Sequence, residues 1–205
     1  MSEPPVPAGL RARAVLLCGP SGCGKTYLAR QTGLPILTLD DFYRPGTEPD
    51  LPRTADGVVD WEDPRTWDVT AACDAVEALC CRGCVDVPNY VFGEDRAVGH
   101  RVLELGDASI LIAEGLFAAE MIEPLRQRGL LADALLIHDG RWRTFARRLL
   151  RDAREARKSR WYLVRQGWAK TMAEPQVVRR LEALGARPIT KADALRRIRE
   201  LAKIG

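Results

Sequence analysis

Residues 18–26 read CGPSGCGKT and concentrate the residue types that bind phosphate. Gly19, Gly24, Lys25 and Thr26 fill the spacing G-x-x-x-x-G-K-[ST]. Glycines let backbone N–H groups approach a polyphosphate without side chains in the way, and the start of a following helix adds partial positive charge. In this spacing the lysine is a point charge for the outer phosphates, and the threonine hydroxyl is an oxygen ligand for Mg²⁺. The stretch therefore predicts a binding site for ATP or GTP.

The elements on either side of this stretch fit that prediction. Residues 14–18, AVLLC, form a short apolar run that is typical of a parallel strand buried on both faces. Residues 25–31 can form a helix, so the order is strand, loop, helix, which is the context in which this spacing binds nucleotides. Similar apolar runs at 35–39, 109–113 and 134–138 predict three more buried strands.

Two acidic residues follow two of these predicted strands. Asp40 comes directly after the run at 35–39, and Glu114 comes directly after the run at 109–113. Because the carboxyl ends of parallel strands meet at one edge of a sheet, we expect both carboxylates to share a crevice with the glycine-rich loop. Carboxylates that face bound phosphates need a cation between them or a hydroxyl to deprotonate. A kinase reaction provides both, because it uses a metal-bound nucleotide and an acceptor hydroxyl.

The alternation of strands and helices predicts an α/β protein with a P-loop NTPase fold, a doubly wound parallel sheet flanked by helices. We expect one domain over residues 14–205 after a flexible, proline-rich start at 1–13. Short strands at 85–90 and 100–105 predict a small inserted β-hairpin. Helices are expected at 64–81, 119–128, 141–157, 159–172 and 176–184, with a last one that Thr190 caps.

The composition indicates the class of protein and the compartment in which we expect it. The chain has 205 residues, of which 46% are hydrophobic and 29% charged, as in an ordinary globular domain. We find no stretch of about 18 apolar residues and no signal-peptide pattern, so we expect a cytoplasmic protein without a membrane span. The six cysteines include Cys81-x-x-Cys84, but no second pair or nearby histidines complete a zinc site. They are interpreted as reduced structural thiols.

Basic residues gather in the second half of the chain. Arg147, Arg151, Arg154 and Lys158 follow a 4-3-4 spacing, which places them on one face of a predicted helix. Such a stripe fits a solvated face, a nucleic-acid site or a lid over bound phosphates. Since the helix follows the fourth strand, it can reach back over the crevice, and we favour a helical lid over residues 151–165 in which Arg151 stabilises phosphoryl transfer.

Several segments together resemble the uridine kinase family of P-loop nucleoside kinases, in order and in spacing, over residues 14–175. The segments are GPSGCGKT, LDDFYR (39–44), DWEDPRTWD (60–68), VPNYVFGEDR (87–96), IAEGLFA (112–118) and RRLLRDAREARK (147–158). The tail after Pro175 does not match the closing strand and helix of that family. Residues that contact adenine are therefore not assigned there.

The resemblance implies roles for individual residues. Asp40 would be the general base at the acceptor hydroxyl, Lys25 and Arg151 would act on the transferred phosphoryl group, and Thr26 with Asp40 or Glu114 would hold Mg²⁺. Nucleotide contacts would come from Gly19, Pro20, Ser21, Gly22, Cys23, Gly24, Lys25, Thr26, Tyr27, Arg147 and Arg151. Acceptor contacts would come from Asp40, Tyr43, Trp61, Glu62, Tyr90, Phe92, Lys158 and Gln166. Glu62 stands where the family usually has an aspartate.

The sequence thus predicts an ATP- and Mg²⁺-dependent kinase that phosphorylates a hydroxyl of a nucleoside or a similar small molecule, with no nucleic acid or membrane as partner. A nucleotide-switched regulatory protein is one alternative, although no base-reading N-K-x-D pattern is present. A nucleic-acid-binding ATPase is a second alternative, because the second half of the chain is rich in arginine. Acids such as Asp152 and Glu155 interrupt a continuous basic track.

One loop departs from the family pattern. After Tyr90 the family usually reads Y-D-F-x-x-H, with the histidine at a pyrimidine base, whereas this chain has Val91, Glu94 and Asp95 in that region. Ionised carboxylates accept hydrogen bonds but cannot donate them. If these carboxylates face the ligand, we expect poor activity on uridine and better activity on an acceptor that carries donors or a positive charge.

Overall fold

The computed structural model describes residues 7–137 and 175–204 of the chain. Its main sheet has five strands in the order β2-β5-β1-β6-β7, and every neighbouring pair is parallel. The strands are β1 (Arg13–Cys18), β2 (Ile36–Thr38), β5 (Ile110–Glu114), β6 (Leu131–Ile137) and β7 (Arg187–Ile189). The four strands expected from apolar runs are confirmed. The predicted doubly wound α/β fold is confirmed with them.

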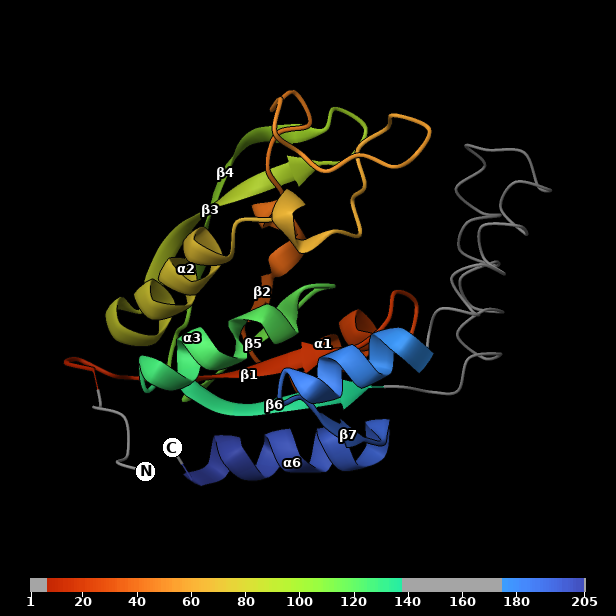
Figure 1. The fold of residues 1–205 in the computed structure, drawn as a ribbon. Coiled ribbons are helices and arrows are strands. Elements are labelled where there is room, and N and C mark those ends of the chain that lie inside the picture. The colour runs from red at the N-terminus through yellow and green to blue at the C-terminus, as the bar shows by residue number, and fades with distance from the viewer. Residues whose placement is uncertain (1–6, 138–174, 205) are drawn as a thin grey trace.

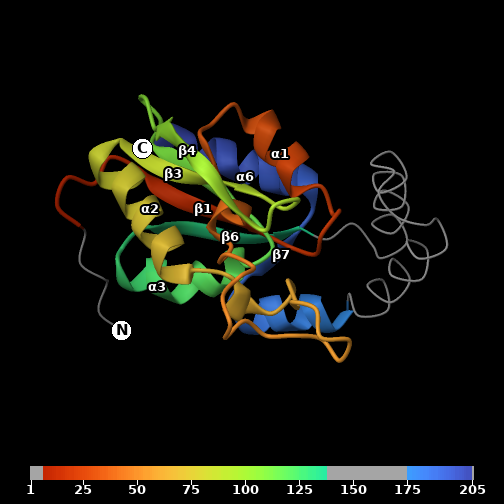
Figure 2. The ribbon, with the colours of Figure 1, turned by 90° about the horizontal axis from the view of Figure 1, so that it is seen from above.

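Helices cover both faces of this sheet (Figures 1 and 2). On one face, α1 (Lys25–Thr32) and α6 (Lys191–Ile204) enclose a core that includes Val15 and Leu17. On the other face, α2 (Val69–Arg82) and α3 (Ile122–Gln127) enclose a core that includes Leu16. Because successive side chains of a strand point to opposite faces, the continuous apolar run of β1 serves both cores.

The inserted β-hairpin is present and longer than expected. Its strands β3 (Cys84–Val91) and β4 (Arg96–Glu104) pair antiparallel and form a separate sheet that rises beside α2 (Figure 1). The expected helix at 64–81 is wrong at its start. Residues Pro64–Thr66 form a 3-10 turn, and α2 begins only at Val69 because the Asp68 side chain accepts a hydrogen bond from the Ala71 N–H and caps it.

The C-terminal part adds a strand that the sequence did not predict. Residues 175–183 are helical as expected, and the Thr190 hydroxyl caps α6 by accepting a hydrogen bond from the Asp193 N–H. Between them, β7 joins the sheet at its edge beside β6. It has only three residues and contains Pro188, which lacks an N–H and is tolerated because β7 is an edge strand.

Asp133 on β6 ties this C-terminal part to the sheet. Its Oδ2 accepts hydrogen bonds from Arg187 Nη2 on β7 and from Arg197 Nε on α6, both at 2.9 Å. The side chain of Asp133 is only 13% exposed, whereas both arginines are partly solvated. The Asp133 carboxylate therefore links β7 and α6 to β6. Because this carboxylate is largely shielded from water, solvent only partly weakens its attraction to the two arginines.

We expect Asp133→Ala to lower the free energy of unfolding by about 1–2 kcal/mol, because two guanidinium groups lose their shared acceptor while remaining partly hydrated. Urea unfolding followed by circular dichroism measures this change. Asp107→Ala, at an exposed turn residue, is the matched control. Equal midpoints for the two variants would contradict this role of Asp133.

The N-terminal stretch, the cysteines and the apolar character of the helices complete the description of the fold. Part of the stretch expected to be flexible is held to the domain, because the N–H groups of Arg11 and Ala12 donate to the Cys80 carbonyl and Ala12 is buried. The six cysteines all lie in the described residues and form no disulfide there. Among the helices that the structure describes, none has the length and apolar character needed to cross a bilayer.

Candidate active site

The glycine-rich loop joins β1 to α1 in the expected strand, loop, helix order. Gly19 and Gly24 have φ of +144° and +95°, and a side chain on Gly19 would lie 2.3 Å from the Ile137 carbonyl oxygen. Only glycine fits such backbone conformations and so close a neighbour. The buried Lys25 side chain folds back over the loop, and its Nζ donates to the carbonyl oxygens of Gly19 and Pro20 at 2.8 and 3.3 Å.

Glu114 meets the glycine-rich loop at the end of β5. In the sheet, β5 lies between β1 and β2, and Glu114 is in register with Leu17 and Thr38. The Thr26 hydroxyl donates to Glu114 Oε1 at 2.8 Å. The predicted convergence of the loop and this carboxylate is therefore present, between strands where the chain reverses its winding direction.

Asp40 lies next to this pair, in the 3-10 turn Leu39–Phe42 that follows β2. Burial raises the pKa of its carboxyl group above the ordinary value of 3.8, and the nearby Glu114 charge raises the pKa further. Lys25 and a hydrogen bond from the Leu116 backbone oppose this shift. Gly115 allows the close approach, because a side chain there would lie 2.7 Å from Leu39 Cβ and 3.2 Å from Asp40 Oδ1.

These groups face a cavity of about 270 Å³ that also carries an aromatic wall. Tyr43 is the centre of that wall, with ring centroids 5.6 Å from Trp61 and 5.4 Å from Phe92, both edge-to-face. The Tyr43 hydroxyl donates to the Trp61 carbonyl at 3.1 Å. The cavity is lined by Ser21, Gly22, Lys25, Thr26, Asp40, Tyr43, Trp61, Glu62, Phe92, Glu114, Gly115 and Leu116.

Some predicted site residues lie elsewhere. Tyr90 does not line the cavity but is buried behind it, against Tyr43 and Phe92, with ring centroids 5.8 and 5.2 Å away. Tyr27 is 66% exposed on α1, and its hydroxyl accepts a hydrogen bond from Gln31. The predicted lid at 151–165 lies outside the described residues. So do four of the predicted contact residues, Arg147, Arg151, Lys158 and Gln166.

The interpretation of the hairpin loop has to be corrected. Glu94 pairs with Arg96, with Oε2 2.6 Å from Nη2, and Val91, Glu94 and Asp95 do not line the cavity. The loop therefore does not present its carboxylates to a ligand in the cavity, and the reason for expecting poor activity on uridine is lost. The third carboxylate in the cavity, beside Asp40 and Glu114, is instead Glu62.

Asp41, which follows Asp40 in the sequence, does not line the cavity. Its Oδ1 accepts a hydrogen bond from the Tyr90 N–H at 3.2 Å, and its Oδ2 lies 2.8 Å from Arg101 Nη2. Both partners belong to the β-hairpin, so Asp41 fastens the hairpin to the turn that carries Asp40. No local sequence signal identifies such a contact, because the partners are 49 and 60 residues away.

The oxygen atoms of this site fit Mg²⁺. A hydroxyl and carboxylates are hard ligands, and Mg²⁺ is commonly held by one or two carboxylates together with substrate phosphates. Among the described residues, no cluster of three or more histidine, cysteine, aspartate or glutamate side chains forms a metal cage of its own. Thr26 and Glu114 are the neighbouring oxygen donors that could hold such an ion, with Asp40 close by.

Glu114→Gln tests this assignment. We expect the Mg²⁺ concentration for half-maximal turnover to rise roughly 10-fold, because the amide keeps the shape but loses the charge. The same change removes a charge that raises the pKa of Asp40, so the acidic limb of the rate profile should move to lower pH. Glu62→Gln, a cavity carboxylate from a different segment, is the control and should leave the Mg²⁺ requirement unchanged. An unaltered Mg²⁺ requirement in Glu114→Gln would contradict the assignment.

The parallel sheet with helices on both faces and the glycine-rich loop between β1 and α1 define an α/β protein with a P-loop fold. No family model matches the chain. Among solved structures, it resembles a putative fructose transport system kinase from Silicibacter sp. TM1040, with a TM-score of 0.63 and 20% identity over 87% of this chain and 89% of that one. A possible uridine kinase from Bacillus stearothermophilus gives a TM-score of 0.47 and 19% identity over 70% and 80% of the two chains.

A curated relative matches by sequence over a shorter range. The inorganic pyrophosphatase TTM1 of Arabidopsis thaliana is 34% identical over 115 residues, or 53% of this chain. The chain spans only 17% of the length of that relative. The match therefore concerns a segment of a much longer protein.

Proposed function

We propose that this protein is an ATP-dependent kinase that transfers a phosphoryl group to a hydroxyl of a small acceptor of nucleoside size. The observation that carries the proposal is the convergence of the glycine-rich loop, the partly buried Asp40 carboxylate and an aromatic wall on one cavity. A simple hydrolase would need the loop and a water molecule, but it would have no use for an aromatic wall beside that carboxylate.

In the proposed reaction, the loop N–H groups and Lys25 bind the phosphates of ATP, and Lys25 exchanges its contacts with the Gly19 and Pro20 carbonyls for phosphate oxygens. When bound, Mg²⁺ neutralises charge on the outer phosphates. Asp40 accepts the proton of the acceptor hydroxyl as that oxygen attacks the γ-phosphorus. Arg151 remains the proposed lid arginine.

The cavity favours an uncharged or cationic acceptor. Lys25 is the one cationic side chain among its lining residues in the described part of the chain, and Asp40, Glu62 and Glu114 are acidic. These carboxylates would repel an anionic acceptor, whereas the hydroxyls of a neutral acceptor can donate to them. Tyr43, Trp61 and Phe92 offer ring surfaces against which a flat base or the apolar face of a sugar packs.

A coupled ADP-release assay over nucleosides, other ribosides, pantothenate, sugars and sugar alcohols tests the proposal. We expect at least one neutral hydroxyl acceptor to raise ADP release well above the rate without acceptor. Phosphate release without acceptor, and hydrolysis of inorganic pyrophosphate, are assayed in parallel. Acceptor-independent release at the full rate would favour a nucleotide-switched protein, and stimulation by DNA or RNA that falls steeply with salt would favour a nucleic-acid-binding ATPase.

A further inference from the structure

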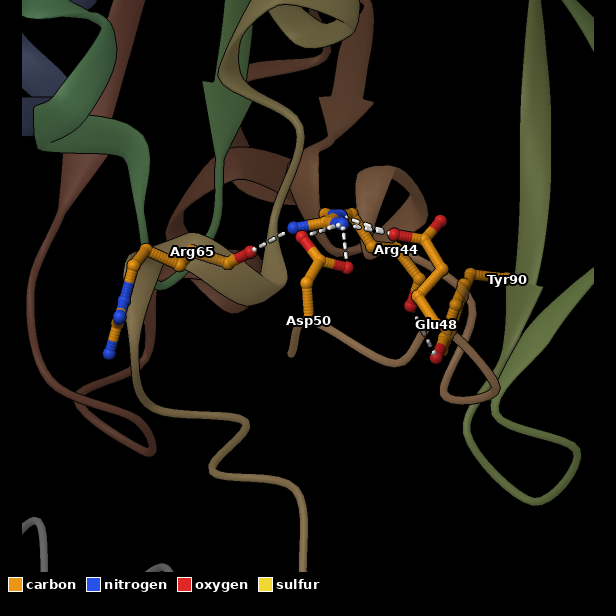
Figure 3. A network of polar contacts seen from close by, with 5 residues as sticks. All are labelled: Arg44, Glu48, Asp50, Arg65 and Tyr90. Carbon is orange, nitrogen blue, oxygen red and sulfur yellow. Dashed lines mark hydrogen bonds and ion pairs between the residues drawn. The ribbon is translucent and has the colours of Figure 1, made fainter. Parts of the chain in front are cut away.

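Arg44 directly follows Tyr43 but does not line the cavity. Its guanidinium group instead contacts three other residues (Figure 3). Nε donates to Glu48 Oε2 at 2.6 Å, and Nη2 lies 2.8 Å from both carboxylate oxygens of Asp50. Nη1 donates to the Arg65 backbone carbonyl at 3.0 Å. All three nitrogen atoms of one side chain are thus bonded within the protein.

The backbone of Arg44 joins the same network. Its N–H donates to the Thr66 carbonyl at 2.9 Å, and its carbonyl accepts a hydrogen bond from the Tyr90 hydroxyl at 3.4 Å. Tyr90 lies on β3, and Thr66 lies in the 3-10 turn before α2. Arg44 is therefore the point at which the hairpin, this turn and the loop after Tyr43 meet.

The partners of Arg44 bracket the residues that complete the cavity. We call residues 45–64 the acceptor loop, because it carries Trp61 and Glu62 into the cavity lining. Asp50 lies in the first part of this loop, and the Arg65 carbonyl directly follows its end. Residues 39–44 and 60–68 are separated in sequence, so the contacts between them fix where Trp61 and Glu62 stand relative to Tyr43. The Arg44 side chain adds to the bond from the Tyr43 hydroxyl to the Trp61 carbonyl.

The shape of the guanidinium group matters more here than its charge. Arg44 and Asp50 are 27% and 66% exposed, and a single solvated ion pair stabilises little. A planar guanidinium binds a carboxylate through two bonds and still presents a third nitrogen to a carbonyl oxygen in a fixed direction. The flexible ammonium group of a lysine cannot hold these groups in one geometry.

We propose that Arg44 is a positioning residue for the acceptor, which fixes the acceptor loop so that Trp61 and Glu62 face Tyr43 and Asp40. The proposal rests on the proposed kinase function for its catalytic part. Its structural part, that Arg44 orders the acceptor loop, stands independently of that function.

The experiment compares Arg44→Met and Arg44→Lys with Arg65→Met as a matched control. Arg65→Met removes a guanidinium of the same region, but it keeps the Arg65 carbonyl that Arg44 uses. Within the described part of the chain, the Arg65 side chain bonds to Asp63. Hydrogen–deuterium exchange measures order without any acceptor. We expect exchange in residues 45–64 to quicken about 10-fold or more in Arg44→Met, less in Arg44→Lys, and not in Arg65→Met, with α1 unchanged in all three.

Steady-state kinetics with the fastest acceptor from the ADP-release screen supply the second measurement. We expect the acceptor KM of Arg44→Met to rise about 10-fold or more, because the cavity wall is displaced, while kcat and the ATP KM stay within about 3-fold. Arg44→Lys should fall between the wild type and Arg44→Met. A general loss of folding would instead lower kcat and quicken exchange in α1 as well.

The two proposals fail in different ways. If no acceptor is found, the proposed function fails, and the exchange data alone decide whether Arg44 orders the acceptor loop. Equal exchange of residues 45–64 in Arg44→Met and Arg65→Met would overturn the positioning role. An acceptor KM that is unchanged in Arg44→Met despite quickened exchange would also overturn it.

Discussion

Lys25→Met is expected to lower kcat/KM for ATP by about 10²- to 10³-fold or more, because the site loses its positive charge at the outer phosphates. Methionine keeps much of the length of the buried stem, so the change isolates the charge. Lys25 also lowers the pKa of the nearby Asp40 carboxyl, and its loss should move the acidic limb of the rate profile to higher pH. Nucleotide titration and turnover measure both effects.

Arg30→Met is the control for this variant. Arg30 is an exposed cation in the last turn of α1, whereas the glycine-rich loop precedes the first turn of that helix. We expect ATP affinity and turnover to stay within about 2-fold, since an exposed charge in solvent interacts weakly over that distance. Wild-type turnover in Lys25→Met would remove the basis of the proposed phosphate site.

Asp40→Asn is expected to reduce kcat by about 10²-fold or more while leaving ATP binding intact. The amide keeps the shape of the carboxylate but cannot take up the proton of the attacking hydroxyl. The pKa of Asp40 is raised, chiefly by burial and then by Glu114, and a general base works only when ionised. Wild-type activity should therefore fall as pH falls through a value above 3.8, and Asp40→Asn should lose that limb. Single-turnover rates across pH measure this.

The same variant should gain stability at neutral pH. Because the folded-state pKa of Asp40 lies above its ordinary value, folding disfavours the ionised form, and its contribution to stability falls as pH rises from 3.8 through the raised pKa. Asparagine removes that unfavourable charge. Thermal unfolding should show a higher Tm for Asp40→Asn at pH 7 and no gain below pH 3.8.

Asp41→Asn is the neighbouring control. It changes the fastening of the hairpin rather than the base, so we expect turnover within about 3-fold of wild type and no gain in Tm, since the charge paired with Arg101 is lost. A kcat for Asp40→Asn equal to that of wild type would move the proton acceptor elsewhere, with Glu62 as the remaining acidic group in the cavity apart from Glu114.

The sequence was sufficient to predict four of the five strands of the sheet and the position of the glycine-rich loop. Continuous apolar runs predicted β1, β2, β5 and β6, and the spacing of Gly19, Gly24, Lys25 and Thr26 predicted the loop between β1 and α1. The rule that parallel strands end at one edge then placed Asp40 and Glu114 together, although they are 74 residues apart. These predictions succeeded because buried parallel strands and glycine-rich turns each leave a local pattern in the sequence.

Only the tertiary structure decided which polar side chains of the loops beside the cavity face it and which make other contacts. The sequence predicts that Glu94 and Asp95 face a ligand, but Glu94 pairs with Arg96 two residues away and neither lines the cavity. Asp41 and Arg44 lie in the same turn region as Asp40 and are equally polar, yet they fasten the hairpin and the acceptor loop. Irregular loops have no periodicity that fixes side-chain direction, so their contacts depend on which distant segments the fold brings beside them. For the same reason β7, short and held at the sheet edge by pairing with β6, became evident only in the folded chain.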